Sequence, residues 1–524
     1  MTAAITGSTQ AVTVRSLMHS PAVTVGPAAR VADAVRLLNG QHVGAAAVVD
    51  DGGQLVGMIT ERDVLHSAGS GVDPSAVVVE AIMTRAPVTI DADASASSAL
   101  ELFSSNRFRH LPVLDAGLVV GILSIRHIVR VAHIEEVRPA GSAPPLAPAG
   151  LEGVAVAETA VGDVRGEEGF FHYRGYDAAE LARTCSFEQV WHLLVRGHLP
   201  SDGEVREFKA LLAGLRQLPA DVEDGLRAIA SATRVTSLSP LAAAVSLLGT
   251  SRQLRPTLDL SHAEIESDCM LVASLVPVLL TRMETYRHGG PAVDADPDLG
   301  YAAAYLQMLT GRRPDPVAAR ALEKYLILTM DHGFNSSTFT ARVITSTGAD
   351  VGAAIAGAIG ALSGPLHGGA PSRALAMLDA IGQPEAAEAY LREEIGAGHK
   401  LMGFGHRIYK TDDPRSTLLR ETAGELGGDL ASFARKVEET ALKVLNELKP
   451  GRRLYTNVEF YAGVVMNSVG IPRDMFTPTF ACSRAVGWTA GIAEQAANNR
   501  IIRPVALYVG PEAPRPLPPG YRYN

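Results

Sequence analysis

The sequence predicts a multidomain protein in which a duplicated α/β module precedes a longer, mostly α-helical region. The chain has 524 residues, which is more than one hydrophobic core usually serves. A sequence pattern occurs twice in the first part of the chain, and helical periodicity dominates the rest. The two parts are separated by a stretch of prolines and small residues, which favours an extended spacer.

Composition and charge limit the classes of function. A net charge of −9 argues against nucleic acid as a partner, because such proteins concentrate basic residues on one surface. The three cysteines, Cys185, Cys269 and Cys482, form no C-x-x-C pair and predict no zinc site, which fits a reducing cytoplasm. We expect no signal peptide, because Met1–Gln10 lacks a basic segment followed by an apolar core. We also expect no membrane span, because the longest apolar runs fall short of ~20 residues or are rich in glycine.

The duplication covers residues 11–134, after a short N-terminal tail of residues 1–10. In the first copy a helix pattern, an apolar strand and a closing strand fall at Val31–Leu38, Ala45–Val49 and Leu55–Thr60. The second copy repeats them at Ala96–Phe103, Leu111–Leu114 and Leu118–Ser124. A unit of about 60 residues in the order strand, helix, strand, strand, helix cannot bury both faces of its sheet, so we expect the copies to pack together.

A linker is expected at residues 135–150. Residues 151–515 are predicted to be mostly helical, and residues 516–524 to form a proline-rich tail. Little strand signal remains beyond a short stretch at Gly153–Val156. Apolar residues at spacings of three and four predict helices at Leu181–Leu194, Ser201–Leu215, Asp315–Met330 and Pro384–Ile395.

Four separate segments of this region combine histidine, arginine and carboxylate residues with glycine-rich turns. They are Asp331–Thr338, Gly364–Ala370, Gly403–Arg415 and Asn457–Gly463. Glycines beside His367 permit close approach of a ligand, and Glu459 is a carboxylate in an apolar run, which raises its free energy unless it is paired or used as a base. Taken singly, each histidine could be structural and each arginine an ordinary surface cation.

The duplicated module resembles a tandem CBS pair, on the evidence of the Gly-x-x-Thr/Ser ending of both copies. The resemblance implies binding of ATP, ADP or AMP between the copies, with Thr60, Asp63 and Ser124 as nucleotide-binding residues. His127 stands where the second copy should carry an acidic residue, so one of the two nucleotide sites departs from the pattern. A scaffold that only promotes dimerisation is the alternative.

The helical region resembles citrate synthase, through the motifs GPLHGGA and GFGHRIYK followed by DPR. The resemblance implies a fold with large and small subdomains, the small one at roughly 368–470, and no bound cofactor or metal. It implies an acyltransferase that joins the acyl group of acetyl-CoA to oxaloacetate as an alkyl group, in a homodimer or higher homo-oligomer.

The same resemblance assigns a role to each candidate residue. It makes His367, His406 and Glu459 catalytic, with His367 polarising the thioester carbonyl. The oxaloacetate ligands are His332, Arg415, Arg484 and Arg503, the last contributed to a partner subunit's site. Lys410 meets the phosphates of coenzyme A.

The chemistry requires a base to remove a proton from the thioester methyl group while a donor stabilises the enolate oxygen. Two departures from the family pattern bear on it: Glu459 replaces the usual aspartate, and Thr329 replaces a histidine. Three alternatives therefore stay open: a 2-methylcitrate synthase that uses propionyl-CoA, a relative that cleaves citryl-CoA, and a catalytically weak protein that responds to nucleotide.

Overall fold

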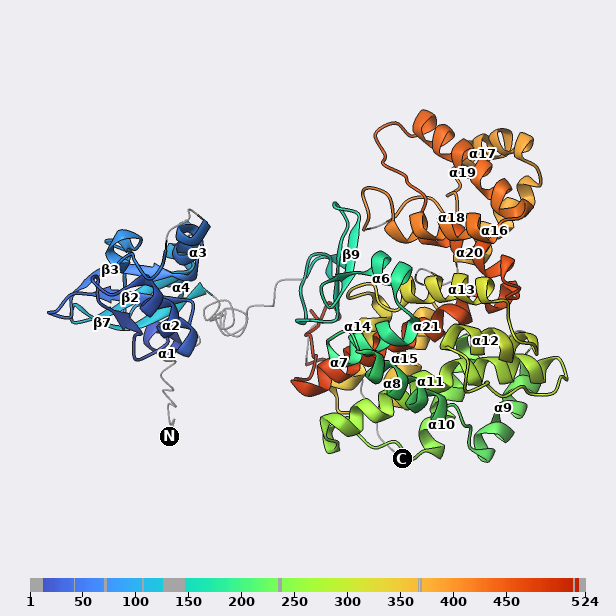
Figure 1. Ribbon diagram of the computed structural model, residues 1–524, viewed down its shortest axis with the longest axis horizontal. Helices are drawn as coiled ribbons and strands as arrows, with labels where there is room; N and C mark the ends of the chain where they lie inside the picture. Colours follow the sequence, from blue (N-terminus) through green and yellow to red (C-terminus); the bar gives the residue numbers. More distant parts are fainter. Residues whose placement is uncertain are drawn as a thin grey trace. The chain divides into compact units, whose positions relative to one another are not determined.

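The computed structural model describes residues 13–41, 43–69, 73–105, 108–125, 147–233, 238–365, 367, 370–406, 408–511 and 514–517. They form two compact units, one holding the elements from α1 to β7 and the other those from η2 to α21 (Figure 1). Among these residues, no helix has both the length and the apolar character that a bilayer crossing requires.

The first unit contains two copies of one arrangement. The first copy comprises β1 (Thr24–Val25), α2 (Val31–Gln41), β2 (Ala45–Val49), β3 (Leu55–Thr60) and α3 (Glu61–Gly69). The second comprises β5 (Ile90–Asp91), α4 (Ala96–Ser105), β6 (His110–Asp115) and β7 (Leu118–Ser124). In both, the first strand runs parallel to the second and the second antiparallel to the third, with a register shift at the same place. The helix expected after β7, with His127, lies outside the described residues.

The two copies share a core, as the sequence predicts. Ala45, Ala47 and Met58 of the first copy cluster with Ile122 of the second. Each sheet is also completed by the segment that precedes the other copy: β4 (Thr84–Arg85) pairs with β3, and His19, which follows α1 (Val14–Leu17), bridges to Ile122 of β7. The short helix η1 (Val79–Ala81) leads into β4. The copies are therefore interlocked rather than merely adjacent.

The second unit begins with η2 (Ala149–Leu151) and a small antiparallel sheet of β8 (Gly162–Arg165), β9 (Phe170–Tyr173) and β10 (Tyr176–Asp177). The rest is helical. Its first helices are α6 (Ala178–Thr184), α7 (Phe187–Arg196), α8 (Asp202–Gly214), α9 (Ala220–Ala232), α10 (Leu238–Ser251), η3 (Thr257–Asp259), α11 (His262–Arg287), α12 (Tyr301–Thr310) and α13 (Pro316–Thr329). Then follow α14 (Ser336–Ser346), α15 (Val351–Leu362), α16 (Ala370–Ile381), η4 (Pro384–Ala386), α17 (Ala387–Gly396), α18 (Pro414–Leu426), α19 (Asp429–Leu448), α20 (Val458–Ser468), η5 (Arg473–Met475) and α21 (Phe476–Ala497).

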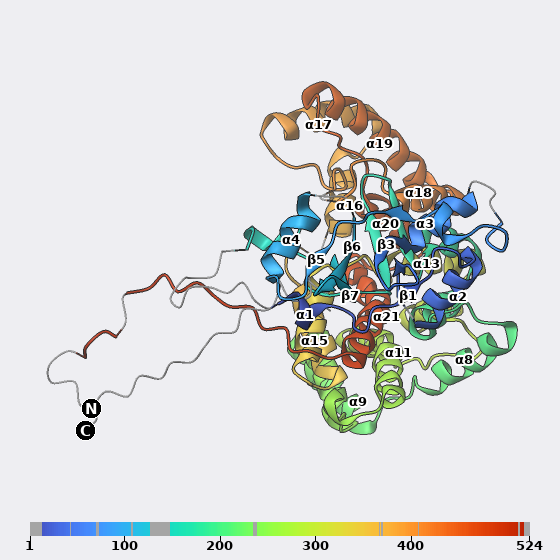
Figure 2. The ribbon, with the colours of Figure 1, turned by 90° about the vertical axis from the view of Figure 1, so that its left-hand side faces the viewer.

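Helices α11 and α21 form the centre of this unit. Both are buried along most of their length, and they pack against each other. Helices α16 to α19 lie together at one end of the unit, apart from α9 to α11, in both Figure 1 and Figure 2. Helix α20 connects the group of α16 to α19 with α13, since it packs on α16 and α18 as well as on α13.

Two details of the sequence prediction are wrong. The single helix expected at Leu181–Leu194 is two helices, because Ser186 caps a new helix with its hydroxyl while Gln189 bonds back to the Ser186 amide. Residues 153–156 form no strand; the sheet begins at β8 instead. The helices expected at Ser201–Leu215 and Asp315–Met330 are confirmed as α8 and α13.

Candidate active site

The candidate residues come from helix ends and the loops between them. His332 follows the end of α13, and His367 lies between α15 and α16. Arg415 and Glu459 stand in the first turns of α18 and α20, while Arg484 lies within α21. The first turn of a helix leaves backbone N–H groups unpaired, which suits it to hold carboxylates.

A buried carboxylate, Asp413, ties two of these helices together. It caps α18 by accepting from the Arg415 amide at 3.0 Å, and it also takes two bonds from the Arg415 guanidinium, at 2.9 and 2.8 Å. The amide of Val458, at the start of α20, donates to Asp413 at 3.1 Å. Both charged side chains are at most 5% exposed, so this pair fixes the orientation of Arg415 and the approach of α20.

His406, Tyr409 and His332 form a second cluster, next to Arg415. The Nε2 atom of His332 lies 3.0 Å from the Tyr409 hydroxyl, and the rings of His332 and His406 are 5.8 Å apart. Nη2 of Arg415 is 3.2 Å from Nε2 of His406. The structure therefore brings three of the predicted residues, His332, His406 and Arg415, into one group.

The His406 side chain is held in one tautomer. The amides of Ile408 and Tyr409 both donate to its Nδ1, each at 3.0 Å, so the proton of the neutral ring sits on Nε2. The guanidinium of Arg415 is also only a donor. Nε2 of His406 and Nη2 of Arg415 are therefore two donors 3.2 Å apart. One oxygen atom could accept a hydrogen bond from each of them.

His367 is anchored to the start of α14. The Ser337 amide donates to Nε2 of His367 at 3.3 Å, and the Ser337 hydroxyl lies 2.8 Å from the same nitrogen. That hydroxyl accepts from Nε1 of Trp488 on α21 at 3.1 Å. Because Nε2 accepts from the amide, the proton of the neutral ring sits on Nδ1, where it can be donated to a ligand.

Arg484 is the second buried cation of the region. It is 2% exposed, donates through Nε to the Thr329 carbonyl at 2.8 Å and stacks on Phe480. Its charge lowers the pKa of His332 and His367 and opposes the rise in the pKa of Glu459. Arg484 therefore lies within electrostatic reach of the base candidate and of two histidines.

Glu459 has an altered basicity. Burial raises its pKa to about 7, with the nearby Asp413 adding to the rise and Arg415 and Arg484 opposing it. Among the described residues, no donor makes a hydrogen bond to its carboxylate. Its backbone amide donates to the Asn457 side chain. A carboxyl group with such a pKa can both take up and release a proton near neutrality.

The three histidines remain neutral at physiological pH. Burial, followed by the charge of Arg415, lowers the pKa of His406 to about 4. Burial and then Arg484 lower the pKa of His367 to about 4, and His332 is shifted well below its usual value by burial and both arginines. Neutral imidazoles can donate one hydrogen bond without adding a charge to the site.

The remaining predicted residues are more peripheral. Lys410 is exposed, and its charge contributes to the low pKa of His406. Arg503 is exposed in the extended segment after α21 and takes no part in the bonds that join the cluster among the described residues. Thr329 is fully buried, with its hydroxyl bonded to the Tyr325 carbonyl and 3.2 Å from that of Ser483, so it contributes to the contact between α13 and α21.

The nucleotide candidates of the first unit line two cavities between the copies. Thr60 and Asp63 line a cavity of about 600 Å³, together with Phe108, Arg109 and His110 of the second copy. Ser124 lines another of about 360 Å³. Both volumes fall within the range of roughly 300–1,000 Å³ that is usual for small-molecule sites.

Thr60 and Asp63 also contact each other. Asp63 accepts from the Thr60 amide at 2.8 Å and from its hydroxyl at 2.7 Å, at the start of α3.

Sequence reasoning missed four residues that organise the site: Asp413, Tyr409, Ser337 and Trp488. For Asp413 a signal was present, because aspartate followed by proline is typical of a helix cap and first position. The roles of the other three depend on contacts between distant segments, which spacing along the chain does not reveal.

The chain is similar to known proteins over most of its length. Residues 150–505 match the family model described as citrate synthase, C-terminal domain, and residues 14–69 and 79–134 match that of the CBS domain. "Citrate synthase 2" of Bacillus subtilis is 38% identical over 70% of this chain and 97% of its own length. A 2-methylcitrate synthase of Shewanella oneidensis is 34% identical, over 71% of this chain and 96% of its own.

A solved structure is also similar. It is that of citrate synthase from Thermoplasma acidophilum, in a ternary complex with carboxymethyl coenzyme A and oxaloacetate. The two chains are 29% identical with a TM-score of 0.64, over 71% of this chain and 98% of the other. From the family match over most of its length and these relatives, we conclude that the chain belongs to the citrate synthase family, as an acyltransferase of the citrate synthase type that carries two CBS domains before its catalytic domain.

Proposed function

We propose that the protein condenses acetyl-CoA with oxaloacetate and hydrolyses the resulting citryl-CoA to citrate and CoA, with Glu459 as the base. The observation that carries the proposal is the raised pKa of Glu459, about 7, in a group that also contains two buried guanidinium groups and neutral histidines. A base near pH 7 suits proton abstraction, and the guanidinium groups suit a dicarboxylate.

Each step then has a residue to perform it. Glu459 removes a proton from the acetyl methyl group, while Nδ1–H of His367 donates a hydrogen bond to the thioester oxygen and stabilises the enolate. The enolate carbon attacks the ketone of oxaloacetate, whose oxygen gains negative charge and takes up a proton to become the hydroxyl group of citryl-CoA. Nε2–H of His406 and the Arg415 guanidinium, whose nitrogens lie 3.2 Å apart, both donate hydrogen bonds to one oxygen of oxaloacetate. Water then cleaves the thioester and releases citrate and CoA.

The same geometry supports a proposal for the substrate ligands. Arg415, fixed by Asp413, and Arg484 bind the carboxylates of oxaloacetate, with His332 beside them. Lys410 is exposed at the edge of the cluster and binds a CoA phosphate. Arg503 reaches the site of a partner in a homodimer; its extended segment exposes Ile501, Val505 and Tyr508, which such an assembly would cover.

The acyl chain length is the first point to test. One extra methylene changes the preference by only ~1–3 kcal/mol, so propionyl-CoA is the competing substrate, as the name of the Shewanella relative indicates for that protein. We expect oxaloacetate-dependent release of CoA, measured by thiol titration, with a higher kcat/KM for acetyl-CoA. A higher value for propionyl-CoA would identify a 2-methylcitrate synthase. Absence of turnover with either substrate would indicate a regulatory protein. A preference for cleavage of citryl-CoA would indicate that the enzyme works in the opposite direction.

Glu459 variants test the base directly. Glu459→Gln removes the proton acceptor, and we expect kcat to fall by about 10²–10⁴-fold while oxaloacetate still binds. Glu459→Asp withdraws the carboxylate by about 1 Å, and a loss of roughly a hundredfold is expected if the site is built around glutamate. A gain in activity with aspartate would contradict this and favour the catalytically weak protein. Glu439→Gln, an exposed change on α19, is the control and should leave kcat unchanged.

The pH profile of the same proteins provides a second readout. Because the pKa of Glu459 is about 7, kcat/KM should fall about tenfold per unit below pH 7, where the base is protonated, and level off above it. The pKa values of His367 and His406 are about 4, and burial holds that of His332 well below its usual value, so the histidines should add no further limb between pH 5 and 7. This limb should be absent from the residual activity of Glu459→Gln.

We further propose that an adenine nucleotide binds the CBS pair and modulates the enzyme in the cytoplasm. Support comes from the cavity that Thr60 and Asp63 share with residues of the second copy. Calorimetry should detect binding of ATP, ADP or AMP, and Asp63→Asn should weaken it at least about tenfold through loss of a charge-assisted bond to a ribose hydroxyl. Asp33→Asn, in an exposed pair with Arg36, is the control. Absence of nucleotide binding, with kinetics insensitive to all three, would instead support a scaffold.

A further inference from the structure

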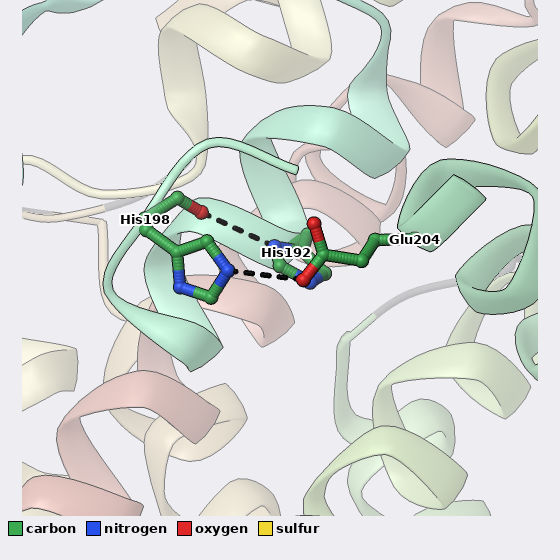
Figure 3. A group of neighbouring side chains, drawn as sticks. All are labelled: His192, His198 and Glu204. Atoms are coloured by element: carbon green, nitrogen blue, oxygen red, sulfur yellow. Dashed lines mark hydrogen bonds and ion pairs between the residues drawn. The ribbon is translucent and has the colours of Figure 1, made fainter. Parts of the chain in front are cut away.

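A second group of ligating side chains lies at the turn between α7 and α8. His192, His198 and Glu204 each offer a nitrogen or oxygen atom, and these atoms all lie within 4.8 Å of one another (Figure 3). Among the described residues, they form the one group of three histidine, cysteine or carboxylate side chains at such distances. None of the three belongs to the catalytic cluster.

The hydrogen bonds of His192 direct a lone pair into this group. Its Nδ1 lies 3.2 Å from the backbone carbonyl of His198, which can only accept, so Nδ1 carries the proton. The other nitrogen, Nε2, is then unprotonated and is the ring atom of His192 left to bind a ligand. The ring is 5% exposed and packs edge-on against Phe208, so its orientation is fixed.

His198 has an acceptor beside each of its ring nitrogens. Its Nδ1 lies 3.3 Å from the Arg196 carbonyl and its Nε2 lies 3.2 Å from Oε1 of Glu204. Both oxygens can only accept, and a neutral ring has one proton, so it satisfies only one of them unless it takes up a second proton. With the proton on Nδ1, the lone pair of Nε2 faces Oε1, an arrangement that a cation between the two atoms stabilises.

Glu204 stays ionised in this position. Ser201 donates to its Oε2 through the amide at 2.8 Å and the hydroxyl at 2.7 Å, forming the capping box of α8. These two bonds, followed by the contact with His198, lower the pKa of Glu204 to about 2. Only Oε1 remains for another ligand, so the group presents two ring nitrogens and one anionic oxygen.

We propose that His192, His198 and Glu204 bind a divalent transition-metal ion of the Zn²⁺ class, with water as the fourth ligand. Two ligands at about 2.0–2.1 Å from a tetrahedral zinc lie ~3.3 Å apart, close to the 3.2 Å between His198 and Glu204. The wider separations close through rotation of these two side chains, which are 59% and 44% exposed. Each histidine already donates its other nitrogen to a carbonyl, the arrangement that orients metal-bound imidazoles.

The ion would join the end of α7 to the start of α8. The turn between them contains Gly197 in the left-handed conformation and Pro200, and both Ser201 and Glu204 belong to the cap of α8. A metal bound by residues from both helices closes this turn and adds stability to the folded chain only, because the ligands are not gathered in the unfolded state. The competing state is an ion pair between a protonated His198 and Glu204.

The test uses the untagged full chain, stripped with EDTA, incubated with Zn²⁺ and desalted, with bound zinc measured by mass spectrometry. His198→Asn removes one ligand, and Glu204→Gln removes the anion while its amide oxygen can still cap α8. We expect each to retain about one Zn²⁺ per chain less than the wild type at pH 7.5.

His399→Asn is the matched control, because His399 pairs with Glu394 at 3.0 Å without belonging to a group of three ligands. It should retain as much zinc as the wild type. Zn²⁺ should also raise the Tm of the stripped wild type by at least about 2 °C, and raise that of His198→Asn by less. Equal zinc in His198→Asn, His399→Asn and the wild type, or no change in the wild-type Tm, would overturn the proposal and leave the ion pair.

Discussion

The catalytic region depends on the burial of Asp413 between two helix starts. Its carboxylate accepts from the Arg415 side chain, from the Arg415 amide and from the Val458 amide. An unpaired carboxylate at 1% exposure would be strongly unfavourable, so these partners must be in place whenever the unit is folded. Through them Asp413 fixes both the guanidinium that faces His406 and the first turn of α20, from which Glu459 projects.

The same burial sets the proton chemistry. Two arginines in a poorly solvated region disfavour protonation of the neighbouring histidines, while desolvation opposes ionisation of Glu459 strongly enough to outweigh their attraction. The outcome is a set of neutral donors beside a carboxyl group that titrates near neutrality. The proposed roles of base and donor therefore depend on where each side chain is buried and which charges lie beside it, not on residue type alone.

Much of the architecture could be predicted because it is local. Strands β2, β3 and β7 of the duplicated module begin and end at the predicted residues. Their apolar residues and the turn residues that flank them mark these strands in the sequence. The break at Cys185–Ser186 was missed because apolar periodicity continues across it, and only the capping box of Ser186 and Gln189 reveals the new helix.

The histidines and arginines of the site could be identified from their motifs, but their partners could not. Tyr409 meets His332 across 77 positions, and Trp488 meets Ser337 across 151, so both contacts arise only from the packing of helices. The group at His192 was overlooked for a related reason: its three residues are close in sequence, but the tautomers that direct their lone pairs inward depend on backbone carbonyls of the folded turn.

The proposed chemistry depends on the convergence of His406 and Arg415 on one oxygen of the substrate. A crystal structure of the full chain with oxaloacetate and carboxymethyl-CoA measures this directly. An oxygen of oxaloacetate is expected within about 2.7–3.2 Å of both His406 Nε2 and the Arg415 guanidinium, with the Glu459 carboxylate facing the carboxymethyl group. Oxaloacetate bound with no oxygen within hydrogen-bond distance of either donor would contradict this assignment.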